Sequence, residues 1–132
     1  MADPAAISGI TPYLSINGAR DAIDFYKKAF DAVERDVMLA DDKTRIMHAT
    51  IEINGAPIFL CDFFPEFGSV VTQPQAFNLH IQVDDAQKWW DRAVAAGCTV
   101  SMKLEKQFWG DIYGQVKDPF GVSWAIDQAD SK

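Results

Sequence analysis

The sequence contains the same structural pattern twice, and this repeat limits the possible folds to a few. Two amphipathic helices are predicted at residues 19–33 and 85–96, because each has apolar side chains on one face and charged side chains on the other. Superposing Phe25 on Trp89 also aligns Tyr26 with Trp90 and Ala29 with Ala93. A repeat of this kind indicates two copies of one structural unit.

Strand-like segments repeat around the two helices. One strand precedes each helix and three follow it, and the last begins after a turn, Asn54-Gly55 in the first half and Phe120-Gly121 in the second. The predicted strands are residues 11–16, 34–40, 44–53 and 56–62, then 78–83, 99–105, 111–117 and 122–127. We predict a single domain over residues 1–132, made of module 10–62, linker 63–75 and module 76–128.

Alternation along the strands assigns a face to each side chain. One set of alternate positions carries mostly apolar side chains and is expected to lie under the helices. Its members are Leu14, Ile16, Met47, Ala49, Ile51, Ile53, Ile58, Leu60, Leu79, Ile81, Val83, Trp124 and Ile126. The positions between them are expected to line a concave cavity. They are Thr11, Tyr13, Ser15, His48, Thr50, Glu52, Phe59, Cys61, Asn78, His80, Gln82, Ser123, Ala125 and Asp127. Such a wall is typical of a small-molecule site. The alternatives are a solvated sheet face or a wall closed by a partner subunit.

The duplicated strand–helix–three-strand pattern, the helix segment DAIDFYKKAF and the segment FWGDIYGQVKDPFGVSW resemble the vicinal-oxygen-chelate superfamily, and within it the PhnB-like branch. This is the group of glyoxalases, bleomycin-resistance proteins and extradiol dioxygenases. The resemblance implies an α+β fold in which two βαβββ modules form a cupped eight-stranded half-barrel with the helices outside and the ligand in the cup. The branch commonly carries WGDR and DPFGH, whereas this chain has Ile112 and Val122 at those places.

The resemblance also implies where a metal would be bound. Metal-using members take one ligand from the first and the last strand of each module, and these places match Thr11, Phe59, Asn78 and Ala125. None of these side chains is a His, Glu, Asp or Cys, which are the usual ligands of a divalent metal. We therefore predict no metal and no other cofactor. A displaced site remains an alternative.

The displaced site would use His48, Glu52 and His80, which share the cavity face by parity. Two His and one carboxylate suit iron, zinc or nickel. His80 and Glu52 are also the candidates for acid–base catalysis without a metal. Asp62 and Asp127 are further acids near the predicted cavity.

Aromatic side chains in loops add candidates outside the strands. Trp109 lies in the short segment KQFWGD, and Phe63, Phe64 and Phe67 crowd the linker. Such side chains stack on flat organic ligands, or they are buried at the ends of a sheet or in a dimer interface. The predicted ligand-binding residues are Thr11, Tyr13, His48, Phe59, Asn78, His80, Gln82, Trp109 and Ala125.

Charge and cysteine content narrow the classes of partner. A net charge of −7 without a basic stripe argues against nucleic acid and against an anionic membrane. The first ten residues lack the pattern of a signal peptide, and Cys61 and Cys98 lack metal-type spacing, so we expect reduced thiols in a cytoplasmic protein. Open sheet edges favour a homodimer.

Two classes of function fit these observations. The first is a metal-free protein that binds a small organic molecule in the cavity. The alternative is an enzyme, namely a lyase, an isomerase or a dioxygenase, that uses a displaced metal or the acid–base residues of the same cavity.

Overall fold

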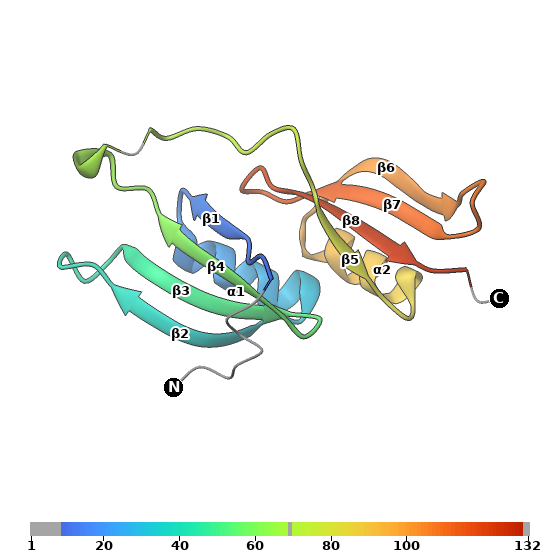
Figure 1. Cartoon of the computed structure of the whole chain (residues 1–132), viewed down its shortest axis with the longest axis horizontal. Helices are drawn as coiled ribbons and strands as arrows, with labels where there is room; N and C mark the ends of the chain where they lie inside the picture. Colours follow the sequence, from blue (N-terminus) through green and yellow to red (C-terminus); the bar gives the residue numbers. More distant parts are fainter. Residues whose placement is uncertain (1–8, 69, 131–132) are drawn as a thin grey trace.

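Residues 9–68 and 70–130 of the computed structural model form two successive units of one strand, one helix and three strands (Figure 1). The first unit comprises β1 (Tyr13–Ile16), α1 (Ala19–Phe30), β2 (Val33–Leu39), β3 (Ile46–Ile53) and β4 (Ala56–Asp62). The second comprises β5 (Leu79–Gln82), α2 (Ala86–Ala96), β6 (Thr99–Lys106), β7 (Ile112–Lys117) and β8 (Ser123–Gln128). A short 3-10 helix, η2 (Pro65–Phe67), lies in the linker. The expectation about a signal peptide concerns mainly residues 1–8, which lie outside this description.

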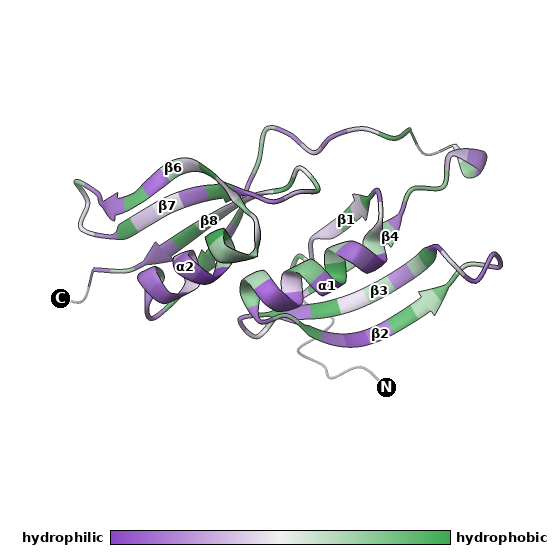
Figure 2. Cartoon of the chain, turned by 180° about the vertical axis from the view of Figure 1, so that it is seen from behind, coloured by the Kyte–Doolittle hydropathy of each residue, from purple (hydrophilic) through white to green (hydrophobic). Residues whose placement is uncertain are grey.

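Each unit forms its own four-stranded sheet. The strand orders are β1-β4-β3-β2 and β5-β8-β7-β6, and the first strand of each unit runs parallel to the last. Both helices lie on the same side of the molecule, behind the sheets in Figure 1 and in front of them in Figure 2. The predicted α+β fold of two βαβββ modules with outer helices is confirmed, and the sheets are open. No helix among the described residues is long and apolar enough to cross a bilayer.

The repeat is visible in the packing of the two helices. Tyr26 and Trp90, which the sequence aligns, are both buried, as are their neighbours Ala29 and Ala93. The helices also contact each other: the Arg92 guanidinium donates from Nε to the backbone oxygen of Lys28 at 2.9 Å. The equivalent faces of the two helices therefore build one continuous core across both modules.

The strand faces follow the predicted alternation with one exception in β3. Leu14, Leu60 and Ile126 are buried, as the alternation predicts. The prediction for Met47 is wrong: Met47 is 39% exposed, and Ile46 is fully buried in its place. The β2–β3 pairing changes register here, so that Met47 has no partner, and an extra residue in one strand reverses the face of the residues before it.

The last strand of each module also holds the start of that module's helix. The Asp62 carboxylate at the end of β4 accepts from the N–H groups of Gly18 and Ala19 at 3.1 and 3.0 Å. At the end of β8, Gln128 Oε1 accepts from the N–H of Ala86 at 2.9 Å. These bonds satisfy donors that a helix N-terminus leaves free, so Asp62 has a structural role.

A buried carboxylate joins the two modules. Asp118 Oδ2 accepts from the Tyr26 hydroxyl of α1 at 2.6 Å and from Trp124 Nε1 of β8 at 2.9 Å. Its Oδ1 accepts from the N–H groups of Phe120 and Val122 at 2.9 and 3.0 Å. The turn that the sequence predicts at Asp118 to Gly121 is thus a contact between modules, and the desolvated carboxylate is satisfied by four donors.

We predict that Tyr26→Phe lowers the free energy of unfolding by about 1.5–3 kcal/mol, because it removes a buried hydrogen bond to a charged group. Asp118→Ala leaves several buried donors unpaired and should lower it further. Urea unfolding measures both changes. Tyr13→Phe is the matched control, since it removes a hydroxyl from a side chain that is 54% exposed. Equal effects of Tyr26→Phe and Tyr13→Phe would contradict the role of Asp118.

Candidate functional site

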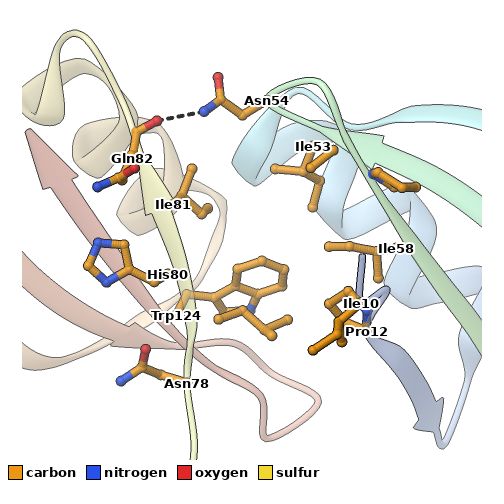
Figure 3. A pocket seen from close by; sticks show the side chains of 13 residues that line it. Ile10, Pro12, Ile53, Asn54, Ile58, Asn78, His80, Ile81, Gln82 and Trp124 are labelled. Carbon is orange, nitrogen blue, oxygen red and sulfur yellow. Dashed lines mark hydrogen bonds between the residues drawn. The ribbon is translucent and has the colours of Figure 1, made fainter. Parts of the chain in front are cut away.

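A cleft of about 530 Å³ lies between the two modules (Figure 3). Its walls come from β5 on one side and from the β3–β4 hairpin with the residues before β1 on the other. The lining residues are Ile10, Pro12, Ile53, Asn54, Ala56, Pro57, Ile58, Asn78, Leu79, His80, Ile81, Gln82 and Trp124. This volume is within the range of small-molecule sites, about 300–1,000 Å³.

The cleft combines an apolar interior with polar groups around it. Trp124, Ile81 and Ile58 are buried side chains that line it. Asn54 Nδ2 donates to the backbone oxygen of Gln82 at 2.6 Å, which bridges the two modules at one end (Figure 3). Asn78, His80 and Gln82 belong to the β5 segment that borders this cleft, but their side chains lie on the side of β5 away from Ile81 and Trp124 (Figure 3). The side chains between the walls come instead from the apolar set that the alternation assigned to the helix side, such as Ile58 and Trp124.

Three other predicted residues meet on the polar face of the first sheet. Tyr13 Oη and His48 Nδ1 are 3.0 Å apart and share a hydrogen bond. The Phe59 ring lies 5.8 Å from the Tyr13 ring and 5.0 Å from the His48 ring, both edge to face. Phe59 pairs with Tyr13 across β1 and β4, so this cluster depends on the strand register.

The polar face of the second sheet carries a different cluster around His80. His80 Nε2 lies 2.9 Å from Asp127 Oδ2, and the His80 ring lies 5.7 Å from the Tyr113 ring. The Tyr113 hydroxyl accepts from Gln115 Nε2 at 2.9 Å. Trp109, which is 46% exposed, packs edge to face against Tyr113 at 5.9 Å. Ala125 is fully buried beside His80, its strand partner.

These two clusters occupy equivalent places in the repeat. Tyr13 is paired with Phe59 in the first sheet, and His80 is paired with Ala125 in the second. Tyr113 lies on β7, the counterpart of the strand that carries His48. Each polar face thus holds one imidazole beside one phenol. The first strand carries the tyrosine in the first module and the histidine in the second, and the third strand carries the other residue.

The sequence analysis missed Tyr113 and Gln115, although alternation in residues 112–117 could have found them. Gly114 and Val116, on the opposite face, are buried. A Cβ at Gly114 would lie 2.7 Å from the Trp90 ring and 2.9 Å from the Leu104 backbone, so the strand packs closely there. The side chains between them must face the open side of the sheet.

Asp127 is a buried acid that is only partly satisfied. It is 6% exposed, and its Oδ1 has no hydrogen-bond partner within residues 9–68 and 70–130. Burial and the neighbouring Asp111 carboxylate raise the pKa of Asp127 above its usual value, while the bond to His80 acts in the opposite direction. The N–H of Asp130, which donates to Asp111 Oδ1 at 3.0 Å, holds the pKa of Asp111 below its usual value. As the pH rises, Asp111 therefore loses its proton before Asp127 does.

The linker aromatics separate into two environments. Phe64 is buried and lies under the Arg45 guanidinium, 4.4 Å from the ring centroid. Phe67 is 77% exposed. Neither lines the cleft.

Comparison with known proteins agrees with this architecture. The profile of the glyoxalase/bleomycin resistance protein/dioxygenase superfamily matches residues 10–126. The chain belongs to this superfamily. An uncharacterised protein of Mycobacterium bovis is 40% identical over 125 residues, which cover 90% of this chain and 82% of that protein.

Solved structures show the same fold. The structure of a protein from Pseudomonas aeruginosa superposes with a TM-score of 0.77 at 25% identity, over 94% of this chain and 99% of that one. The PhnB protein of Bacillus cereus superposes with a TM-score of 0.73 at 22% identity, over 92% and 100% of the two chains.

Thr11, Phe59, Asn78 and Ala125 are the residues that the resemblance predicts at the metal-ligand places. Strand β1 begins at Tyr13 and β5 at Leu79, so Thr11 and Asn78 lie just before the strands. Phenylalanine and alanine side chains offer no donor atom to a metal.

The residues of the predicted displaced site are not brought together. Glu52 accepts two hydrogen bonds of 3.0 Å from the Arg35 guanidinium, His48 contacts Tyr13, and His80 contacts Asp127. In the part of the chain that the structure describes, no group of three or more His, Cys, Asp or Glu is arranged to hold a metal ion.

The raised pKa of Asp127 predicts how stability depends on pH. Between the pKa values of the unfolded and folded states, the folded chain binds more protons, so its stability falls as the pH rises through that interval. Asp127→Asn cannot titrate and should escape this loss. We predict that the stability of Asp127→Asn relative to the unaltered protein increases from about pH 3.5 to about pH 7.

Urea unfolding at several pH values measures this difference. Asp41→Asn removes one negative charge from an exposed position and serves as the control. A loss of stability in Asp127→Asn that grows towards neutral pH would show that the Asp127 carboxylate stabilises the fold.

Proposed function

We propose that this superfamily member binds a small organic molecule in the cleft between its two modules, without the divalent metal that other members use. The observation that carries the proposal is the cleft of about 530 Å³, with buried Trp124 and Ile81 in its lining and the Asn54 amide at one end. Apolar walls with a few polar groups are the usual composition of a ligand site.

The lining favours a flat and mostly apolar ligand with one or two polar groups. Apolar surface that leaves water on binding supplies the favourable free energy, and the Asn54 amide at one end of the cleft can orient a polar group. The net charge of −7 disfavours a ligand that enters as an anion. A neutral aromatic compound fits these conditions best.

The alternative function, a lyase, an isomerase or a dioxygenase, divides into two cases. A metal-dependent enzyme would need His48, Glu52 and His80 to converge, and each has a different partner. Acid–base catalysis without a metal is favoured by a specific observation, the contact between His80 and the buried Asp127.

Blocking the cleft tests the binding proposal. Ala56 lines the cleft and is exposed, so Ala56→Trp should fill part of the cavity without disturbing the core. We predict that it weakens the binding of small aromatic compounds, identified by saturation-transfer NMR, at least about tenfold, or about 1.4 kcal/mol. Ala95→Trp on the exposed side of α2 is the matched control.

The same measurement in the presence of a strong chelator tests the second part of the proposal. Binding is expected to be unchanged, and elemental analysis of the pure protein is expected to find no stoichiometric metal. Unchanged binding to Ala56→Trp would overturn the cleft as the site, and loss of binding on chelation would overturn the metal-free proposal.

We infer that two chains associate as a homodimer. Edge strands β2 and β6 carry exposed apolar side chains, namely Val33, Met38, Leu39, Val100 and Met102, and the polar faces of both sheets are open. Edges and faces of this kind are commonly covered by a second copy. Cys61 and Cys98 are free thiols, and we infer the reducing cytoplasm as the location of the chain.

Light scattering at micromolar concentration tests the association. The expected mass is twice the 14.7 kDa of one chain. Met38→Glu, which places a charge on the edge strand β2, should shift the equilibrium towards the monomer. The control Lys103→Glu on exposed β6 should leave the mass unchanged if β2 forms the interface. A single-chain mass for the unaltered protein would overturn the homodimer.

A further inference from the structure

The wall of the cleft that β5 forms is the edge of a sheet. Among the described strands, β5 pairs with β8 alone, so its other side carries backbone N–H and C=O groups outside the ladder. The cleft lies on this other side, because the backbone oxygen of Gln82 accepts there from Asn54 of the first module. The edge therefore offers backbone donors and acceptors to a molecule in the cleft.

Alternation along β5 determines which backbone groups face the cleft. In an extended strand, the N–H and C=O of one residue point to the same side, and those of the next residue point to the opposite side. The Val83 N–H donates to the Asp127 oxygen of β8 at 2.9 Å, whereas the Gln82 oxygen faces the cleft. Ile81 therefore bonds to β8, and His80 directs its N–H and C=O into the cleft. This explains why His80 borders the cleft although its side chain lies on the other face (Figure 3).

The free groups form a short ordered series, which we call the backbone array. In chain order it consists of the His80 N–H, the His80 C=O and the Gln82 N–H, that is donor, acceptor and donor. Within residues 9–68 and 70–130, no group bonds to these three across the cleft, whereas the next group, the Gln82 C=O, is bound by Asn54. The matching edge of a ligand has an acceptor, a donor and an acceptor.

The opposite wall of the cleft is apolar. Ile10 and Ile58 line it, together with Pro12 and Pro57, which have no N–H to donate. An extended peptide beside β5 would turn half of its own backbone groups towards this wall and leave them unsatisfied, which is costly in a buried place. A ligand with polar groups on one edge and apolar surface on the other avoids this cost.

We propose that the cleft recognises a flat, neutral aromatic imide through the backbone array of β5. This inference rests on the proposed function of the cleft. The imide N–H donates to the His80 C=O, and the two imide carbonyl groups accept from the N–H groups of His80 and Gln82. The apolar edge of the ligand lies against the wall that carries Ile58, where burial supplies favourable free energy.

Phthalimide is a suitable probe, because its imide lies on one edge and its benzene ring on the other. N-methylphthalimide is the matched control, since a methyl group replaces the N–H. At a pH at which phthalimide is neutral, the unaltered protein should bind it at least about tenfold more tightly than the control, as measured by ligand-observed NMR. Equal affinities would overturn the imide and leave the cleft as an apolar binding site.

Two variants of His80 separate the backbone from the side chain. His80→Pro removes the N–H that faces the cleft and no bond to β8, and proline is accepted at such places on an edge strand. His80→Ala removes the contact with Asp127 and keeps the N–H. We expect His80→Ala to bind phthalimide as the unaltered protein does, and His80→Pro to bind it about tenfold more weakly. Equal losses in the two variants would overturn the backbone array.

Amide NMR of the unaltered protein tests the backbone array without a variant that has to fold. Phthalimide should move the amide proton signals of His80 and Gln82 downfield, and it should change that of Ile81, which bonds to β8, much less. Unmoved His80 and Gln82 signals with phthalimide bound would overturn the inference. Binding of other aromatic compounds without binding of phthalimide would overturn the imide alone, whereas unchanged binding to Ala56→Trp would overturn the cleft itself.

Discussion

The Asp118 carboxylate connects the parts of this molecule on which the candidate site depends. It accepts from Tyr26 of the first module's helix and from Trp124 of the second module's last strand, and it closes the turn before that strand. Trp124 is at the same time a lining residue of the cleft. The interaction that fixes the two modules against each other therefore also fixes one wall of the cavity between them.

The internal repeat explains why two different surfaces are available. Both modules place an imidazole and a phenol on the open face of the sheet, at equivalent strands but with the residues exchanged. In the first module His48 is bonded to Tyr13, and their neighbour is the apolar Phe59 ring. In the second module His80 is bonded to an acid, with the small Ala125 beside it. The same fold thus gives one surface of aromatic contacts and one surface on which an imidazole contacts a carboxylate.

Sequence patterns were sufficient for the fold because it depends on local periodicity. Helix and strand spacing determined the modules and most strand faces, and only a change of register misplaced Met47, which alternation cannot detect. The cleft could not be predicted, since its shape depends on how the modules pack through Tyr26 and Asp118. His80 was identified by its face, but its bond to Asp127 depends on the β5–β8 register, which only the structure supplies.

Two buried acids in the second module differ in how well their oxygens are satisfied. Asp118 is 5% exposed and Asp127 is 6% exposed, so the desolvation of the two is similar. Asp118 is satisfied by four donors, two of them from backbone N–H groups of its own turn. Asp127 has His80 on one oxygen and no partner on the other within the described chain, with Asp111 nearby. A carboxylate with four donors gains more from its hydrogen bonds than one with a single partner, so at similar burial Asp118 is expected to contribute more to the stability of the fold than Asp127.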